Sequence, residues 1–293
     1  MVAGSVEPYS PHKTNQVVNV KELLARGRTE LEDQPTGRLE AEILLGEALE
    51  VGRAWLYANP EQIPVLKQSA RFLDLVRRRK NGEPIAYLTG YREFWSLPLK
   101  VTADVLIPRP ETELLVETAL AFIPEDAAWR IADLGTGSGA IALAIAVERP
   151  LCEIHATEYS EGALEVAQEN GRAITPGRVL FHLGSWLTPL EGTFQVLVSN
   201  PPYIASDDTH LQRGDCRFEP GDALTPGRDA MAAIRQIASE SLRYLKHGGM
   251  LAFEHGYEQG NKVRQMLVEL GYANVDTRID LENRERVTSG IRE

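Results

Sequence analysis

Cysteine is scarce in this chain of 293 residues, because only Cys152 and Cys216 occur. A disulfide scaffold and a zinc site built from cysteines alone are therefore excluded. The six histidines are scattered, and no pair of them has the HExxH spacing of a metal-binding helix. The sequence predicts no metal, and so few cysteines suit a reducing, cytoplasmic compartment.

Long hydrophobic runs are also missing. The longest clean apolar run covers residues 140–147, whereas a membrane-spanning helix needs about 20 residues. The first 15 residues lack a basic start followed by an apolar stretch, so we expect no secretory signal and no membrane contact. With 43% hydrophobic and 25% charged residues, the chain has the composition of a globular protein with one large or two ordinary domains.

The chain has fewer basic than acidic residues, and this difference is distributed unevenly along the sequence. Residues 1–90 hold 12 Lys+Arg and 12 Asp+Glu, whereas the remainder holds 19 and 30, which gives the chain its net charge of −11. Such a charge repels a phosphate backbone, so we expect no direct nucleic-acid substrate unless a local basic patch overrides it.

A helical pattern fills the first part of the chain after residues 1–17, which we expect to form a loose tail. Apolar residues recur every three or four positions from Val20 to Arg79. We therefore predict a small helical bundle over residues 1–85 that docks the substrate. The basic run Arg77–Lys80 is interpreted as a solvated helix end favoured by the helix dipole, with a docking patch for an acidic partner as the alternative.

Residues 86–110 are predicted to be a linker with a β-hairpin, because apolar and aromatic residues alternate between Phe94 and Leu106. From residue 111 onward, helices and strands alternate, which predicts an α/β domain over residues 111–293 with a mostly parallel, doubly wound sheet. The predicted strands are 130–134, 153–157, 179–182, 194–199, 250–254 and 275–279, and the predicted helices are 111–122, 140–148, 162–170, 230–244 and 259–270.

A glycine-rich loop joins the first of these strands to its helix. Gly135, Gly137 and Gly139 allow a tight turn and a close approach of backbone to ligand. About 20 residues later, Glu158 ends the next predicted strand, where an acid accepts hydrogen bonds from both ribose hydroxyls. The two signals together predict a ligand that contains adenosine.

Two classes of adenosine ligand fit this loop. The pattern Gly135-x-Gly137-x-x-Ala140 also matches the dinucleotide fingerprint. Asp133 two residues before the first glycine, and the third glycine, make the motif similar to motif I of class I S-adenosylmethionine-dependent methyltransferases. A nicotinamide enzyme and a purely structural turn remain as alternatives, while the absence of GKS or GKT excludes a P-loop.

The tetrapeptide Asn200-Pro201-Pro202-Tyr203 follows the fourth predicted strand, at the sheet edge where such folds bind ligands. The two prolines fix the backbone and remove two N–H donors. The Asn200 side-chain oxygen and the Pro201 carbonyl are then left to accept both hydrogens of a planar –NH2 group, with Tyr203 against its face. Taken alone, the tetrapeptide also fits a rigid turn capped by asparagine.

An amide nitrogen is a poor nucleophile because its lone pair is delocalised. Holding both of its hydrogens favours a pyramidal nitrogen with the lone pair directed at a methyl donor. Displacement at a sulfonium then depends on proximity, orientation and electrostatics, and requires neither a metal nor a strong base.

At this point the sequence resembles the protein-glutamine N5-methyltransferases of the HemK/PrmC family. The resemblance covers residues 38–290 and rests on AEILLGEAL, GEPIAYLTGYREFWSLPL, LIPRPETELLVE, DLGTGSGAIALAIA, SNPPYI, RFEPGDAL, LAFEHGYEQG and ERVTSG. It implies a Rossmann-like class I methyltransferase fold and methylation of the glutamine in the Gly-Gly-Gln motif of class I peptide-chain release factors, in translation termination. It also implies S-adenosylmethionine as cofactor, with S-adenosylhomocysteine as product.

The resemblance further implies the site residues. Cofactor contacts are expected at Gly135, Thr136, Gly137, Ser138, Gly139, Glu158, Trp186 and Asn200. Contacts with the substrate glutamine are expected at Asn200, Pro201, Pro202, Tyr203 and Phe94, with Asn200, Pro201 and Tyr203 closest to the chemistry. Pro108, Arg109 and Pro110 are expected near the open side of the cofactor.

Some of these positions have a second interpretation or depart from the family pattern. Phe94 could instead be a core aromatic of the hairpin, and Arg109 could form an ion pair with Glu111 or Glu113. The ribose-binding acid is often Asp in the family and is Glu158 here, and Ser185 stands where the family usually has an acid for the adenine amino group. We interpret His255 as a packed or solvent-exposed histidine and Cys216 as a plain loop residue.

Competing functions share parts of this pattern. A sister group of the family modifies a glutamine of a large-subunit ribosomal protein, and DNA or RNA amine methyltransferases also carry the tetrapeptide. A base-flipping enzyme needs a basic channel, which the net charge disfavours. A non-catalytic cofactor-binding scaffold is the remaining alternative. No coiled-coil pattern or large apolar stripe is present, so we expect a monomer.

Overall fold

The computed structural model describes residues 18–293, so the tail predicted for residues 1–17 lies outside the described part. The chain divides into two compact units, residues 1–89 and residues 90–293. The division differs from the boundaries drawn at 85 and 110, because it assigns the hairpin region to the second unit.

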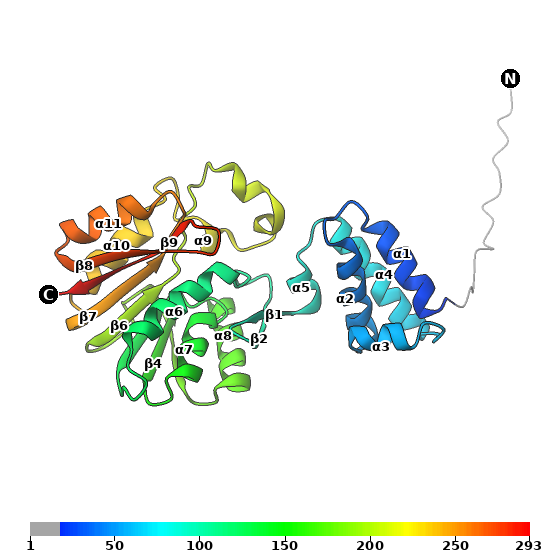
Figure 1. Ribbon diagram of the computed structural model, residues 1–293, viewed down its shortest axis with the longest axis horizontal. Coiled ribbons are helices and arrows are strands. Elements are labelled where there is room, and N and C mark those ends of the chain that lie inside the picture. The colour runs from blue at the N-terminus through cyan, green and yellow to red at the C-terminus, as the bar shows by residue number, and fades with distance from the viewer. Residues whose placement is uncertain (1–17) are drawn as a thin grey trace, which may run out of the picture. The chain divides into compact units, whose positions relative to one another are not determined.

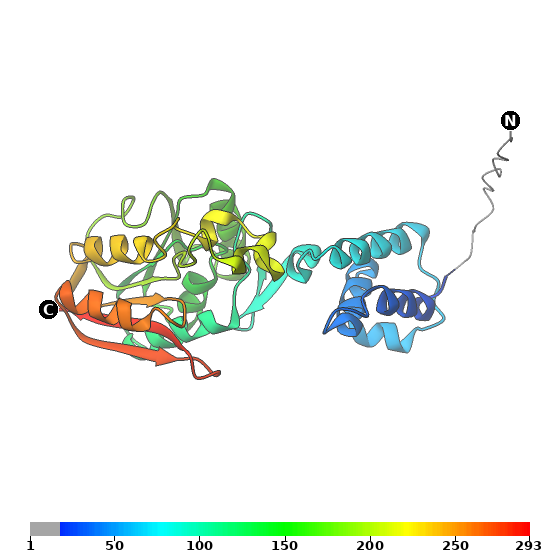
Figure 2. The same ribbon diagram turned by 90° about the horizontal axis from the view of Figure 1, so that it is seen from above.

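Within residues 18–89, the first unit contains five helices, in the region where the apolar spacing of the sequence is helical (Figures 1 and 2). Helix α1 begins with a capping box in which Asn19 and Glu22 bond to each other's backbone N–H. Leu23, Leu44 and Phe72 are each at most 1% exposed in the shared core. The helices are α1 (Val20–Glu30), α2 (Gly37–Leu49), α3 (Arg53–Ala58), α4 (Leu66–Lys80) and α5 (Ile85–Thr89).

The four basic residues that end α4 each have an acidic partner within the first unit. The pairs are Arg77–Asp74, Arg78–Glu83, Arg79–Glu40 and Lys80–Glu30. These pairs support the interpretation of the run as a helix end, and the docking patch stays a prediction.

The second unit begins with the antiparallel hairpin of β1 (Tyr91–Phe94) and β2 (Leu97–Lys100). Its two turn residues, Trp95 and Ser96, both have positive φ, as a tight hairpin turn requires. The Glu113 carboxylate accepts the Trp95 N–H at 2.9 Å and holds this turn. Asn170 bonds to both backbone groups of Lys100 and donates to the Ser138 carbonyl at 2.8 Å, which ties the hairpin to the glycine loop.

A seven-stranded sheet forms the centre of this unit, in the order β5-β4-β3-β6-β7-β9-β8. The five strands from β5 to β7 are parallel, whereas β9 is antiparallel to both of its neighbours. The strands are β3 (Arg130–Leu134), β4 (Glu153–Glu158), β5 (Val179–Leu183), β6 (Phe194–Ser199), β7 (Leu245–Glu254), β8 (Tyr272–Ile279) and β9 (Glu285–Arg292). Along the chain, β4 and β5 extend the sheet on one side of β3, and β6 and β7 extend it on the other side. The order of the strands therefore reverses at β3, next to β4 and β6, which is where such folds bind ligands.

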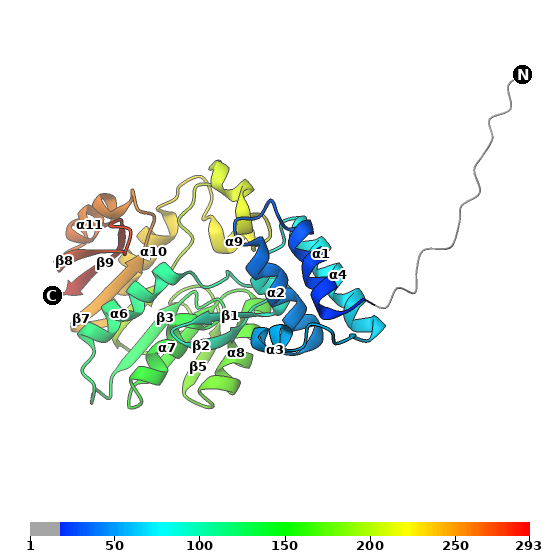
Figure 3. The same cartoon turned by 45° about the vertical axis from the view of Figure 1, so that its right-hand side comes forward.

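Helices cover both faces of the sheet. Ile131 and Ala132 of β3 are neighbours in sequence, yet they belong to different hydrophobic clusters on opposite faces. Helices α6 (Glu113–Phe122), α7 (Ala140–Glu148) and α8 (Glu161–Ile174) lie on one face, and α10 (Ala232–Ser241) and α11 (Gly260–Glu269) on the other (Figures 1 and 3). Short helical turns complete the unit: η1 (Pro110–Thr112), η2 (Thr209–Gln212), η3 (Gly214–Arg217) and α9 (Gly221–Leu224).

The predicted fold class is confirmed, since a Rossmann-like mixed sheet follows an N-terminal helical domain. The predicted strands at residues 130–134 and 194–199 have the observed bounds, whereas β9 was not predicted. Among residues 18–293, no helix is both long and apolar enough to cross a membrane.

Candidate active site

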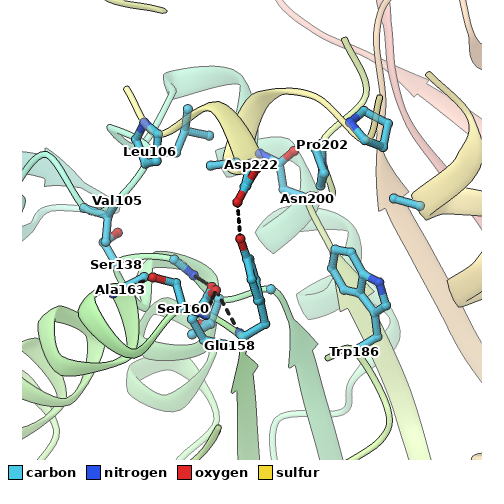
Figure 4. Close-up of a pocket in the computed structure, with 18 of the residues that line it drawn as sticks. Val105, Leu106, Ser138, Glu158, Ser160, Ala163, Trp186, Asn200, Pro202 and Asp222 are labelled. Atoms are coloured by element: carbon cyan, nitrogen blue, oxygen red, sulfur yellow. Dashed lines mark hydrogen bonds between the residues drawn. The ribbon is translucent and has the colours of Figure 1, made fainter. Parts of the chain in front are cut away.

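A cavity of about 940 Å³ opens at the carboxyl ends of the central strands of the second unit. In Figure 4, Asn200 and Pro202 lie on one side of this cavity, and Glu158 and Ser138 lie on the other. The sheet thus brings the glycine loop, the acid after it and the first residue of the tetrapeptide to one cavity.

The glycine loop uses its glycines in two ways. Gly135 and Gly137 have φ of +74° and +56°, a region that favours glycine. A Cβ on Gly135 would lie 2.8 Å from the Trp186 ring, whereas one on Gly137 would meet nothing within 4 Å. Gly135 is therefore needed for packing as well as for conformation, whereas Gly137 lines the cavity with free space where a side chain would stand.

Asp133 lies beneath this loop and is fully buried. One of its oxygens, Oδ2, accepts the Thr136 hydroxyl at 2.6 Å and the Ala142 N–H at 3.2 Å, so it joins the loop to the start of α7. Oδ1 has no hydrogen-bond partner among the described residues. Burial raises the pKa of Asp133 to about 7, because the charged form loses its hydration.

Glu158 is the last residue of β4, and its carboxylate is fixed by backbone groups. Oε2 accepts the Gly137 N–H at 2.9 Å, and Oε1 accepts the N–H groups of Tyr159 and Ser160 at 2.9 and 3.0 Å. A carboxylate has about four acceptor positions. The group can therefore still accept a hydroxyl in the cavity that it lines.

Tyr159 and Asp222 form a contact that sequence reasoning missed. The Tyr159 hydroxyl donates to the Asp222 carboxylate of α9, and both residues line the cavity (the dashed line that ends at Asp222 in Figure 4). The hydrogen bond to Asp222 raises the pKa of Tyr159 to about 12, so the hydroxyl stays protonated. This link joins the end of β4 to a segment 63 residues away.

Trp186 and Ser185 line the cavity from the loop after β5. Trp186 has a φ of +46°, a conformation rare for a large side chain, and it packs against Gly135. Ser185 is exposed and offers only a hydroxyl where an acid was expected from the family pattern.

The tetrapeptide is held by residues far away in sequence. Asn200 donates from Nδ2 to Thr112 Oγ1 at 3.2 Å, and it lines the cavity together with Pro202. Tyr203 does not line the cavity; its hydroxyl donates to Glu254 Oε1 at 3.1 Å, and burial raises its pKa. Pro201, the second residue of the tetrapeptide, is buried. Only Asn200 and Pro202 of the four residues thus reach the described cavity wall.

Arg109 lines the cavity and forms an ion pair with Glu219, not with Glu111 or Glu113. The suggested partners Glu111 and Glu113 were therefore wrong, because the fold brings an acidic residue 110 positions away in the sequence next to Arg109. Glu219 also accepts the Ile107 N–H at 3.0 Å, so it fixes the cavity-lining segment before Pro110. Burial raises the pKa of Glu219, and the Arg109 guanidinium opposes that shift.

Phe94 lies in the core cluster under the hairpin, is 2% exposed and does not line the cavity. Its contact with a substrate stays a prediction. His255 is packed, since Nδ1 donates to the Gly256 carbonyl at 2.9 Å and Nε2 accepts the Thr288 hydroxyl at 2.7 Å. Cys216 is half-buried, and burial raises the pKa of its thiol.

No group of three His, Cys, Asp or Glu side chains within residues 18–293 is arranged to hold a metal ion. The cavity lining instead includes the fixed Glu158 carboxylate, the Trp186 indole and the Asn200 side-chain amide. This donor set suits an organic ligand with hydroxyls next to a second ligand with an amide.

Two family models match this chain. Residues 22–90 match the model described as the PrmC N-terminal domain, and residues 110–217 match the methyltransferase small domain. The first match covers most of the helical unit, and the second covers the glycine loop and the tetrapeptide.

Relatives of similar length are named release factor glutamine methyltransferase. That of Aliivibrio fischeri is 45% identical over 262 residues, which are 89% of this chain and 92% of the relative. That of Escherichia coli is 46% identical over 263 residues, which are 89% of this chain and 95% of the relative. The crystal structure of a methyltransferase from Pyrococcus furiosus has a TM-score of 0.51 at 18% identity, over 73% of this chain and 96% of that chain, and supports the fold alone.

Proposed function

Because the chain belongs to the release factor glutamine methyltransferase family, we propose that its cavity binds S-adenosylmethionine beside a glutamine side chain of a release factor. The enzyme is a protein-(glutamine-N5) methyltransferase. Its proposed substrate is the glutamine in the Gly-Gly-Gln motif of class I peptide-chain release factors.

One observation carries the proposal. Asn200, Glu158 and Gly137 line the same cavity of about 940 Å³. An acceptor for an amide and acceptors for a ribose are thus close enough to bring two ligands together, and proximity with correct orientation supplies much of the rate in a displacement reaction.

The residues present fit the cofactor. Glu158 retains an acceptor position for a ribose hydroxyl, and residues 135–138 line the part of the cavity assigned to the amino-acid part of the ligand. Trp186 presents an indole beside the loop, and Ser185 can bond to the adenine edge only through its hydroxyl or backbone. When bound, S-adenosylmethionine supplies a methyl group on a positively charged sulfur, which is an excellent leaving group.

The tetrapeptide holds the glutamine amide. Asn200 Oδ1, in the cavity wall, is assigned one of its two N–H hydrogens. The carbonyl of Pro201, whose side chain lies outside that wall, is assigned the other, and Tyr203 supports the tetrapeptide from behind the wall through Glu254. Fixing both hydrogens favours a pyramidal nitrogen whose lone pair faces the cofactor side of the cavity. The nitrogen loses its proton readily once it is alkylated, so this chain needs no strong base.

The first unit is the proposed contact for the body of the release factor. Its match to the PrmC N-terminal domain covers residues 22–90.

Methyl transfer from labelled S-adenosylmethionine tests the proposal. Purified release factor, large-subunit ribosomal proteins and unmethylated DNA are offered in parallel, and the label is mapped by mass spectrometry. We expect label on the Gly-Gly-Gln glutamine and none on a release factor with glutamate at that position. Label on a ribosomal protein or DNA, with the release factor unlabelled, would show that the proposed substrate is wrong.

A further inference from the structure

The Asn200 side chain is oriented by a residue outside the tetrapeptide. Its Nδ2 donates to Oγ1 of Thr112, which is the last residue of η1 and is 4% exposed. A planar amide carries its nitrogen and oxygen on opposite sides. The bond from Nδ2 therefore leaves Oδ1 facing away from Thr112.

Thr112 and Tyr203 both lie beside the carboxyl group of Glu254, which is 1% exposed at the end of β7. The Tyr203 hydroxyl donates to Oε1 at 3.1 Å. Oε2 has no hydrogen-bond partner among the described residues. Burial raises the pKa of Glu254, whereas the hydroxyls of Thr112 and Tyr203 stabilise its charged form.

The fold explains why these groups meet. Strands β6 and β7 are parallel with Ser199 opposite Phe253, so Asn200 and Glu254 follow at the same edge of the sheet. Thr112 comes from a segment 88 residues before Asn200. The cluster therefore depends on three chain segments.

We propose that Thr112 and Glu254 are positioning residues that hold Asn200 with Oδ1 toward the substrate amide. Thr112 accepts from Asn200, and Glu254 lies beside Thr112 and accepts from the Tyr203 hydroxyl. This inference rests on the proposed function, in which Asn200 Oδ1 accepts a substrate N–H. An Asn200 amide turned by half a rotation would present its –NH2 to the substrate –NH2, donor against donor.

Replacing the Thr112 hydroxyl tests this arrangement. Thr112→Val, of the same shape, should lower kcat about 10-fold and leave KM for the release factor and Kd for S-adenosylmethionine within about twofold, because it acts on orientation. Thr112→Ser should restore kcat. Unchanged kcat in Thr112→Val would overturn the proposal.

Thr118 gives a matched control, because it is 5% exposed on α6 and its hydroxyl donates to the Leu114 carbonyl at 2.7 Å. Thr118→Val should keep wild-type kinetics. An equal loss of kcat in Thr118→Val and Thr112→Val would attribute the effect to general packing and overturn the proposal.

Glu254→Gln keeps the size of the side chain and removes its charge. We expect about a 10-fold lower kcat. In the double variant with Thr112→Val we expect no loss beyond that of the more impaired single variant, since both residues act on the orientation of the same Asn200 side chain. Fully additive losses would contradict the inference.

A measurement on the free enzyme separates this inference from the proposed function. The side-chain –NH2 signals of Asn200 are identified by NMR from their loss in Asn200→Ala. They should shift in Thr112→Val, return in Thr112→Ser and stay in place in Thr118→Val. Signals unmoved by Thr112→Val would overturn the positioning role, whereas an enzyme that does not methylate the release-factor glutamine would refute the proposed function alone.

Discussion

The two sides of the cavity are built differently. On the glycine-loop side, Asp133 reaches partners three and nine residues away, and Glu158 reaches one 21 residues away. On the tetrapeptide side, Asn200 and Tyr203 reach side chains 88 and 51 residues away. The first side is encoded by short motifs and backbone hydrogen bonds, whereas only the complete fold assembles the second.

This difference suggests a division of labour. Backbone groups and a fixed carboxylate suit tight binding of a small ligand whose shape does not change. Side chains that orient one another suit a reacting group, where small changes in angle alter the rate. Variants on the first side should therefore act on cofactor affinity, and variants on the second side on kcat.

The largest expected effect is that of Asn200→Ala. Removing an acceptor aimed at the reacting amide should lower kcat about 10²- to 10³-fold, as for donors that act mainly in a transition state. Kd for S-adenosylmethionine should stay within about threefold, because residues 135–158 carry most of that binding. Single-turnover methylation and calorimetric titration give the two quantities.

Asn261→Ala is the control for that variant, because Asn261 is exposed on α11. It should match the wild type in both quantities. A large rise in Kd with kcat preserved in Asn200→Ala would erase the proposed division between the two sides.

Glu158→Gln should have a smaller effect of the opposite kind. A glutamine side chain turns one acceptor into an –NH2 donor that faces backbone N–H groups, and it loses charge-assisted bonds to ribose hydroxyls. We expect Kd for S-adenosylmethionine to rise about 50-fold, with kcat at saturation within about threefold. Glu161→Gln, exposed at the start of α8, should leave Kd unchanged. A normal Kd with a low kcat in Glu158→Gln would contradict the assignment of Glu158 to cofactor binding.

How well the sequence predicts each element depends on where its stabilising contacts lie. Strands β3 and β6 are mostly apolar and buried along almost their whole length, so their bounds are visible in the sequence. Strand β9 buries only Val287, Thr288 and Gly290 of its eight residues. Its pairing with β7 and β8 defines it, and no local pattern signals that pairing.

The same rule holds for the site. The glycine loop and Glu158 could be predicted because fixed spacing along the chain carries the geometry. Thr112, Glu254 and the Tyr159–Asp222 link could not, since each is recruited by contacts between distant segments. Arg109 shows both outcomes: its place at the cavity was predicted, and its acidic partner was not.

The smallest expected effect concerns the free energy of unfolding. It shows whether the glycine-loop side stays folded equally well when the buried Asp133 carboxyl carries no charge. The folded state raises the pKa of Asp133 from an ordinary 3.8 to about 7, so Asp133 stabilises the fold fully below about pH 3.8 and loses this contribution as pH rises through 7. Asp133→Asn stays neutral, and its oxygen can still accept from Thr136. From pH 5.5 to 8, its free energy of unfolding should therefore rise by about 2 kcal/mol relative to the wild type. Urea denaturation at both pH values measures this, with the exposed Asp126→Asn as control. A difference independent of pH would mean that the loop holds the Asp133 carboxylate in its charged form, and that both sides of the cavity depend on charged groups.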